Sequence, residues 1–413
     1  LCTEMTNSDG DSYRIIDFCP RFEQHGRMFR PLTIIRIVEP IRGNSSIQVA
    51  CRPISGWDKK PAVQSRGNSH INYAIQENFL RVTTNMSLTY LENQTPLFLK
   101  EKLYFYLSWN SSVDEDLQLV SHRFLTQTQQ YWKTWVKHCS IPSLFQKETI
   151  RSALTLKLHC FEDTGAILAA LTTSLPEEPG NTRNWDYRYC WLRDAYFVLT
   201  AFHNLGHFEE MEGFLKFILD IAHHHEASRE RLAPVYTLGR ELPLPEIIHK
   251  NWAGFQNSSP VRHNNQAAEH IQNDVYGEMI LALSPVFFDE RFYDLRTKEY
   301  EDLLIHFAKF ATKSISLPDA GLWEVRNGWQ EHTFTNLMLW AGIERLERIQ
   351  KLGYLKNLSI DITKEKKRAE KAIEIAIKNG SARNGPKDES FDAALALMPI
   401  LKYPADVISN ATL

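Results

Sequence analysis

The sequence has little that would support metal binding, disulfide bonding or membrane insertion. Its 413 residues include six cysteines, none at the spacing of a metal site or a disulfide-rich domain. Such scattered cysteines predict a protein of the reducing cytoplasm. No apolar run is long enough to span a bilayer, and neither a phosphate-binding Gly loop nor a Gly-x-Ser-x-Gly motif occurs. We therefore expect no metal, no cofactor and no membrane partner.

The charge balance is close to neutral, whereas apolar and aromatic residues are plentiful. A net charge of −3 gives no sign of a nucleic-acid partner. Apolar residues make up 43% of the chain, which is enough for a substantial core. Ten tryptophans and an aromatic share of 11% favour surfaces on which a ligand can stack.

The N-terminal part is predicted to be an antiparallel β-sandwich. Short β-branched and aromatic runs alternate with turn residues, as in sheets built from hairpins. We expect this domain to cover residues 1–115 and a linker helix to follow at 116–146. The strands are expected at 13–18, 32–38, 46–52, 70–74, 79–84 and 97–108.

From residue 147 to 413 the apolar residues recur at helical spacing. This pattern predicts an α domain in which long loops, rich in polar and aromatic residues, separate the helices. Such loops, held by a helical scaffold, are where sites are usually built. The helices are expected at 150–171, 192–202, 208–222, 266–283, 300–314, 333–350, 364–378 and 391–401.

The densest polar and aromatic cluster lies at residues 183–194. It reads Arg-Asn-Trp-Asp-Tyr-Arg-Tyr-Cys-Trp-Leu-Arg-Asp and is followed at once by a helical pattern. Indole rings stack on the apolar face of a sugar, and Asp and Arg form charge-assisted hydrogen bonds with hydroxyl groups. The cluster therefore indicates a sugar site, and the alternative is a structural ion-pair network beside a core helix.

A second candidate is Glu324, which follows Trp323 in a loop containing two glycines. A carboxyl group beside an indole is partly desolvated, which favours its neutral, proton-donating form. Glu324 is thus a candidate general acid. The alternative is a surface ion pair between Glu324 and Arg326.

Four segments together resemble glycoside hydrolase family 15, the glucoamylase-like family, whose prokaryotic members include glucoamylases and trehalases. They are Asn-Trp-Asp-Tyr-Arg-Tyr-Cys-Trp-Leu-Arg-Asp at 184–194, Pro-Val-Arg at 260–262, Asn-Asp-Val-Tyr-Gly-Glu at 273–278 and Gly-Leu-Trp-Glu-Val-Arg at 321–326. Asp-Phe-Cys-Pro at 17–20 is similar to the β-sandwich that precedes the catalytic domain in that family. The resemblance covers nearly the whole chain.

The resemblance implies an (α/α)6 toroid that hydrolyses glycosidic bonds with inversion, using two carboxylic acids. Glu324 matches the general acid. The residues that match or adjoin the family's substrate-binding positions are Trp185, Asp186, Arg193, Asp194, Arg262 and Trp323. Arg193 and Asp194 would hold the terminal sugar, Trp185 and Asp186 would wall the same subsite, and Trp323 would flank the acid.

The sequence departs from the family pattern in its extent. The family toroid has twelve helices, and about eight are predicted here, so we expect a chain truncated at both ends and an incomplete toroid. The family's general base would lie beyond Leu413. Glu389 stands before a predicted helix start, where a cap is the expected role. Asp274 and Glu278, one helical turn apart, could form a carboxylate dyad, but the resemblance implies that Asp274 supports the site from behind.

The sequence therefore predicts an exo-acting, inverting α-glucoside hydrolase that releases glucose from the non-reducing end of α-glucan oligosaccharides. One alternative is a trehalase of the same family. Another is a relative that binds carbohydrate or regulates without catalysis, because fold alone does not fix function.

Overall fold

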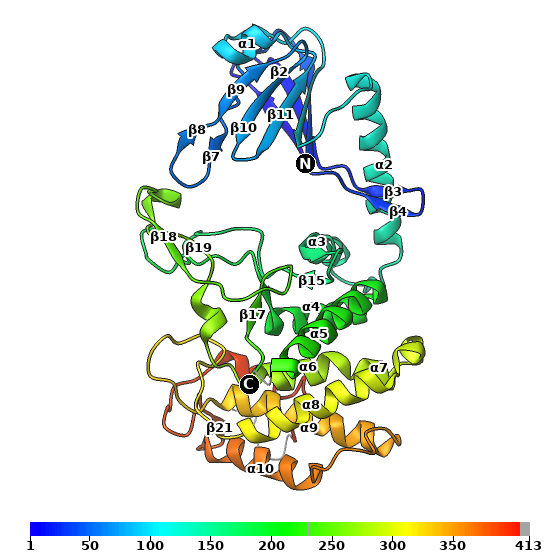
Figure 1. Cartoon of the computed structure of the whole chain (residues 1–413), viewed down its shortest axis with the longest axis vertical. Helices are drawn as coiled ribbons and strands as arrows, with labels where there is room; N and C mark the ends of the chain where they lie inside the picture. Colours follow the sequence, from blue (N-terminus) through cyan, green and yellow to red (C-terminus); the bar gives the residue numbers. More distant parts are fainter. Residues whose placement is uncertain (229–230, 405–413) are drawn as a thin grey trace. The chain divides into compact units, whose positions relative to one another are not determined.

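The computed structural model describes residues 1–228 and 231–404. The chain divides into two compact units, Leu1–His138 and Cys139–Leu413 (Figure 1). The first unit is built on β-strands and the second mainly on helices. No helix in the described ranges is both long enough and apolar enough to cross a membrane.

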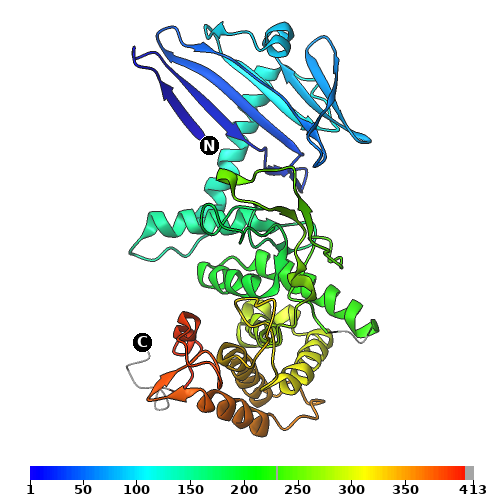
Figure 2. The same ribbon diagram turned by 90° about the vertical axis from the view of Figure 1, so that its left-hand side faces the viewer.

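Within residues 1–138, all of which the structure describes, a seven-stranded antiparallel sheet forms the framework (Figure 2). Its strand order is β1-β2-β5-β13-β11-β10-β9. The strands are β1 (Cys2–Thr6), β2 (Ser12–Phe18), β5 (Thr33–Arg42), β9 (Val63–Arg66), β10 (His70–Ile75), β11 (Asn78–Thr84) and β13 (Leu103–Trp109). Three of its six neighbouring pairs, β1–β2, β9–β10 and β10–β11, join consecutive strands through short turns, whereas the other three join strands that are farther apart in the chain.

The two faces of the sheet bury separate apolar clusters, because successive side chains of a strand point to opposite sides. On β13, Tyr104 and Tyr106 face one cluster, whereas Leu103 and Phe105 face the other. Helix α2 (Leu117–Lys137) covers the tyrosine side. Its buried residues and the strand residues that they meet are Phe22, Ile35, Ile37, Val120 and Phe124.

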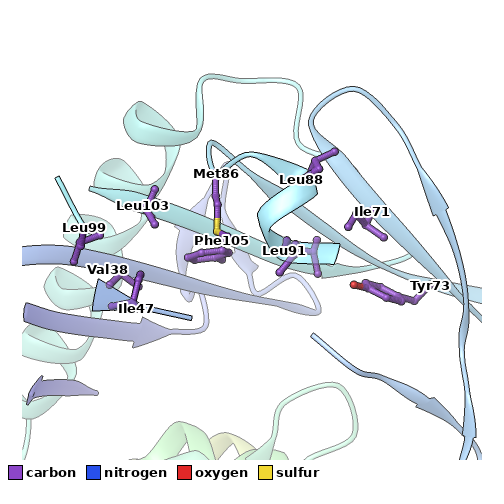
Figure 3. Close-up of a cluster of buried hydrophobic side chains, with 11 residues drawn as sticks. Val38, Ile47, Ile71, Tyr73, Met86, Leu88, Leu91, Leu99, Leu103 and Phe105 are labelled. Carbon is purple, nitrogen blue, oxygen red and sulfur yellow. The ribbon is translucent and has the colours of Figure 1, made fainter. Parts of the chain in front are cut away.

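The opposite face is covered by short elements in place of a second large sheet. They are the two-stranded sheet of β6 (Ser46–Ile47) and β12 (Leu97–Phe98) and the helix α1 (Leu88–Asn93). Figure 3 shows Leu91 and Met86 beside the ring of Phe105 in this cluster. Two further small hairpins pair β3 (Phe22–Gln24) with β4 (Arg27–Phe29) and β7 (Ile54–Ser55) with β8 (Lys60–Pro61).

The second unit is a helical domain with small hairpins in its loops (Figure 1). Its helices are α3 (Gln146–His159), α4 (Leu192–Leu205), α5 (Phe208–Ser228), α6 (Asp274–Leu283), α7 (Pro285–Phe288), α8 (Lys298–Ser314), α9 (Thr333–Lys351) and α10 (Ile362–Ile375). The hairpins are β14–β15 (Cys160–Phe161 with Ala166–Ile167), β16–β17 (Cys190–Trp191 with Val235–Tyr236), β18–β19 (Ile247–His249 with Val261–His263) and β20–β21 (Ile377–Lys378 with Ser381–Ala382). Short 3-10 turns occur at Phe255–Asn257, Gln266–Glu269, Glu290–Leu295 and Ala393–Leu397.

Helix α6 lies at the centre of this unit. All ten of its residues are buried, and it packs against α4, α8 and α9. A helix surrounded by other helices is apolar on nearly every side, as the run from Met279 to Leu283 is here. The helix backbones of α6 and α9 approach closely, because a Cβ added at Gly277 would lie 2.2 Å from the carbonyl oxygen of Met338.

The predicted fold class, an antiparallel β region followed by an α domain, is confirmed. Most predicted strands and helices are present, and the differences follow from local turns. The helix expected at 150–171 ends at His159, because the β14–β15 hairpin turns at Gly165 with φ +82°. The helix expected at 266–283 is divided into a 3-10 turn and α6, and the one expected at 391–401 is only the 3-10 turn Ala393–Leu397.

Substitution of Gly277 by Ala should destabilise the helical unit. The added methyl group would overlap the backbone of α9, and such overpacking costs about 1–3 kcal/mol. Gly213→Ala in α5 is the matched control, since its Cβ would meet the nearest atom, Gly165 Cα, at 3.6 Å. Thermal unfolding should show a lower midpoint for Gly277→Ala and an unchanged or raised one for Gly213→Ala. Equal midpoints for the two variants would contradict the close packing of α6 on α9.

Candidate active site

A cavity of about 850 Å³ lies among the loops of the second unit. Three segments of the chain line it, around residues 169–194, 265–270 and 322–326. Its volume is within the range of sites that enclose small ligands. Its charged and aromatic lining residues are Glu177, Arg183, Trp185, Tyr187, Trp191, Arg193, Asp194, His270, Trp323, Glu324 and Arg326.

Three N–H groups converge on one carboxyl oxygen of Glu324. The indole Nε1 of Trp191 donates to Oε1 at 2.6 Å, the amide Nε2 of Gln272 at 3.1 Å and Nη2 of Arg193 at 3.3 Å. Gln272 also accepts a hydrogen bond from Arg193 Nη1 at 3.0 Å, which joins the two donors. Among the described residues Oε2 has no hydrogen-bond partner, so it is the oxygen left for a ligand or a proton.

The backbone of Glu324 is in the left-handed region, with φ +55°. This conformation costs a non-glycine residue roughly 1–2 kcal/mol, so the surrounding loop must hold it. Hydrogen bonds within the loop do so, from Glu324 N to Gly321 O at 3.1 Å and from Val325 N to Ala320 O at 3.0 Å. The turn directs the Glu324 carboxyl group to Trp191 and leaves the preceding residue facing outward.

Asp319 anchors this loop to the helices behind it. Its fully buried carboxylate accepts hydrogen bonds from Asn273 N at 2.8 Å, Gly321 N at 3.1 Å and the Thr335 hydroxyl group at 3.0 Å. Burial raises the pKa of Asp319 to about 6, and the three donors act against the rise. The anchor thus connects the loop of Glu324 to the starts of α6 and α9.

Arg193 and Asp194 lie in the first turn of α4, directly after strand β16. An acidic side chain in this position is favoured by the helix dipole. Arg193 Nη2 lies 3.5 Å from Asp194 Oδ2, which is buried and has no hydrogen-bond partner among the described residues. Burial raises the pKa of Asp194, and repulsion from Glu324 adds to the rise, whereas Arg193 opposes it.

Beneath the cavity, Asp274 and Glu278 are completely buried on α6. None of their four carboxyl oxygens has a hydrogen-bond partner among the described residues. Burial and the neighbouring Asp319 raise the pKa of Asp274 to about 7; burial and Asp274 raise that of Glu278 well above its usual value. Burial alone would lower the pKa of Arg193, but the surrounding carboxyl groups raise it. The direct contacts that hold Arg193 are those with Gln272, Glu324 and Asp194.

Trp185 lines another part of the cavity and carries two arginines over its ring. The guanidinium carbon of Arg262 lies 4.4 Å from the ring centroid and that of Arg326 lies 4.1 Å from it. Glu246 joins the two arginines, since Oε1 accepts from Arg262 Nε at 3.0 Å and Oε2 from Arg326 Nη2 at 2.8 Å. We call these four residues, Trp185, Glu246, Arg262 and Arg326, the arginine clamp.

The structure brings four predicted site residues together around the cavity and places a fifth at its edge. Trp185, Arg193, Asp194 and Glu324 line it, as does Trp323. Trp323 is 59% exposed, however, and its indole donates to Asp392 at 3.3 Å. The indole that contacts Glu324 is that of Trp191, which the sequence motif contained but which was not assigned a role.

Asp186 and Arg262 do not line the cavity. Asp186 is fully buried and accepts two hydrogen bonds from the guanidinium group of Arg188, at 2.8 Å each. Alternate residues of the extended segment around Trp185 point to opposite sides, so Asp186 faces the interior. Arg262 is buried behind Trp185, where Glu246 and Asn184 occupy its donors and burial lowers its pKa.

Sequence reasoning missed Gln272 and Glu246. Gln272 directly precedes the 273–278 motif, which was a usable signal, whereas Glu246 stands in a long loop with no distinguishing neighbours.

Glu389 is exposed, pairs with Lys378 Nζ at 2.5 Å and is not among the lining residues. Among the described residues, no group of three or more His, Cys, Asp and Glu side chains could hold a metal ion.

Replacing Asp274 by Asn should stabilise the protein in a pH-dependent way. The folded-state pKa of about 7 exceeds the unfolded value of about 3.9, so the folded protein binds the proton more tightly. The stability of the unsubstituted protein therefore falls as pH rises from about 4 to 7. Asn does not ionise, so the variant should gain on the order of 1–3 kcal/mol relative to it across that window.

Denaturant unfolding at several pH values between 4.5 and 7.5 measures this difference. Asp302→Asn, at an exposed position of α8, is the control. A difference between Asp274→Asn and the unsubstituted protein that stays constant with pH would show that Asp274 does not take up a proton in this window.

Comparisons with known proteins identify the family of the helical domain. Residues 145–412 match the family described as Glycosyl hydrolases family 15. A trehalase of Mycolicibacterium smegmatis is 28% identical over 389 residues, which cover 90% of this chain and 58% of that protein. A trehalase of Thermoplasma volcanium is 26% identical over 421 residues, covering 98% and 64%. The chain spans 45–64% of the length of the curated relatives that it matches.

Among solved structures, the glucoamylase of Saccharomycopsis fibuligera is similar with a TM-score of 0.44 and 12% identity, over 68% of this chain and 59% of that one. The family match extends over the whole loop and helix framework that forms the cavity and includes Arg193, Asp194 and Glu324. The resemblance noted in the four sequence motifs is thus confirmed, and the chain belongs to glycosyl hydrolases family 15.

Proposed function

We propose that the protein hydrolyses an α-linked glucose disaccharide in this cavity, with trehalose as its substrate and Glu324 as the general acid. The observation that carries the proposal is the fixed carboxyl group of Glu324, which has one oxygen held by three N–H donors and the other open. An acid held in this way delivers its proton from Oε2, because Oε1 already accepts from Trp191, Gln272 and Arg193.

The charges of the cavity support an uncharged substrate. Three arginines line it, Arg183, Arg193 and Arg326, together with three carboxyl side chains, Glu177, Asp194 and Glu324. Arg183 and Glu177 neutralise one another at 2.8 Å. A neutral sugar offers hydroxyl groups to both kinds of side chain, whereas a phosphorylated sugar would need an excess of cationic donors.

We propose trehalose as the substrate, in place of a longer α-glucan, because of the proteins that the chain is similar to. The curated relatives reported above carry the name trehalase, and they match across both the β region and the helical domain. The glucoamylase-type reaction, which the sequence alone favoured, is the second candidate. Both reactions begin with a terminal α-glucose beside Arg193 and Asp194, so the terminal-sugar site does not discriminate between them.

Proton NMR of the sugar released at early times tests the proposal. The complete reading frame that encodes this chain is expressed and given trehalose and maltotriose separately. Cleavage of trehalose, with the β anomer of glucose accumulating beside its α anomer, is expected from an inverting enzyme. If β-glucose is released from maltotriose and trehalose is not cleaved, the glucoamylase-type reaction is the function. If glucose binds but neither sugar is cleaved, the protein is a non-catalytic relative.

Substitution of Glu324 by Gln should lower kcat by about 10²–10⁴-fold, because the amide donates no proton to the glycosidic oxygen. Binding of glucose, measured by calorimetry, should be nearly unchanged. Glu389→Gln is the control, since Glu389 is exposed and lies outside the cavity lining. Turnover that survives in Glu324→Gln would exclude Glu324 as the general acid.

Substitution of Asp194 by Ala should weaken binding of the terminal sugar. A hydrogen bond to a charged group contributes about 1.5–3 kcal/mol, so the Kd for glucose should rise by at least about tenfold. Asp302→Ala on α8 serves as the control. An unchanged Kd for glucose would remove Asp194 from the sugar site.

A further inference from the structure

The lining residues of the cavity differ in burial, and the side chain of Asp194, next to Arg193, is 40% exposed. The side chains of Arg193 and Glu324 are 14% and 22% exposed, and Trp191 beside them is almost fully buried. The side chain of Arg326 is 39% exposed, and those of Arg183 and Glu177 are more exposed still. A disaccharide whose terminal glucose reaches Arg193 and Asp194, and whose glycosidic oxygen meets Glu324, extends its second sugar past Glu324 toward other lining residues, among them Arg326.

Arg326, which lines the cavity, has N–H groups that are available to a ligand. A guanidinium group carries five N–H donors. One nitrogen, Nη2, is held by Glu246 Oε2 at 2.8 Å, and Nη1 lies 3.5 Å from Gln266 Oε1. No other acceptor among the described residues occupies the rest, so N–H groups remain for the hydroxyl oxygens of a ligand.

Glu246 fixes Arg326 to a buried part of the protein. The Glu246 side chain is 12% exposed, and each of its oxygens accepts from one arginine of the arginine clamp. Arg262, the buried arginine, is itself held by Asn184 Oδ1 at 2.6 Å and Thr182 O at 3.0 Å. The mobile side chain of an arginine is thereby pre-ordered, which lowers the entropy lost when it binds a ligand.

The remaining member of the arginine clamp, Trp185, lines the cavity beside Arg326. Two guanidinium groups already lie over its ring, at 4.1 and 4.4 Å from the centroid. A sugar that binds beside Trp185 would therefore be recognised by the hydrogen-bond donors of Arg326 more than by stacking on an open face of the indole ring.

We propose that Arg326 selects the second sugar, the one that leaves on hydrolysis, by donating hydrogen bonds to its hydroxyl groups. Glu246 is the positioning residue that holds Arg326 in place. This inference deepens the proposed α-glucoside hydrolysis and rests on it, since it assigns the side of the cavity away from Arg193 and Asp194 to the leaving sugar.

Steady-state kinetics of Arg326→Gln in the complete protein test this assignment. The substrates are trehalose, maltose and α-glucosyl fluoride, whose leaving group is a fluoride ion and has no second sugar. For the disaccharide that the protein cleaves, kcat/KM should fall by about tenfold or more through KM. For α-glucosyl fluoride it should change by less than about twofold. Arg348→Gln, which also removes an arginine paired with a glutamate, is the matched control.

The Glu246→Gln variant tests the positioning step. It should reproduce the rise in KM for the disaccharide, leave α-glucosyl fluoride unaffected and leave the pH profile of kcat unchanged. Arg326→Lys keeps the charge but loses the planar guanidinium group, so it should restore little of the lost affinity. A parallel loss on all substrates, or a shift of the pH profile, would show that the clamp acts on Glu324 or on folding and would overturn the proposal.

Binding without turnover separates this proposal from the proposed function. Calorimetry in the Glu324→Gln background compares Kd values for trehalose, maltose and glucose with and without Arg326→Gln. The proposal requires a rise of about tenfold for a disaccharide and none for glucose. If the protein cleaves neither disaccharide, the proposed function fails while this comparison still decides the assignment; equal effects on glucose and disaccharides would overturn it.

Discussion

The convergence of three N–H groups on Oε1 of Glu324 is the interaction on which the site depends. Its donors come from the end of a strand, from the segment before α6 and from the first turn of α4, so one carboxyl oxygen joins three parts of the helical domain. The left-handed backbone at Glu324 is the strained conformation that makes this convergence possible. Hydrogen bonds within the loop and the buried Asp319 hold that conformation, and they leave Oε2 open toward the cavity.

Helix α6, behind the site, carries two buried carboxyl groups that are energetically unfavourable and that act on Arg193. Asp274 and Glu278 are buried without hydrogen-bond partners among the described residues, and burying such groups opposes folding. Their carboxyl groups act electrostatically on Arg193 and raise its pKa, which opposes the effect of its burial. The close packing on α9 at Gly277 fixes the position of α6, which carries both carboxyl groups. The buried carboxyl groups thus lower the stability of the fold while they act on a charged residue of the site, as is common where function requires fixed charges.

Much of this could be predicted from the sequence, and the errors have physical causes. Periodicity gave the β region, the α domain and most elements, and the motifs identified Arg193, Asp194 and Glu324, which do meet. Adjacency in sequence was a poor guide to side-chain direction. Asp186 follows Trp185 but faces the interior, and the left-handed turn at Glu324 directs its carboxyl group to Trp191 while Trp323 faces outward. Gln272 and Glu246 act through partners far along the chain, and a single sequence carries no record of such contacts.

The central claim is that the Glu324 carboxyl group lies at the glycosidic oxygen of a sugar held by Arg193 and Asp194. The most direct test is a crystal structure of the complete protein carrying Glu324→Gln, with intact trehalose bound. The predicted result places one glucose within hydrogen-bond distance of Asp194 and Arg193 and the bridging oxygen about 3 Å from the side chain of residue 324. A disaccharide bound elsewhere, or bound here with its bridging oxygen turned away from residue 324, would contradict the account.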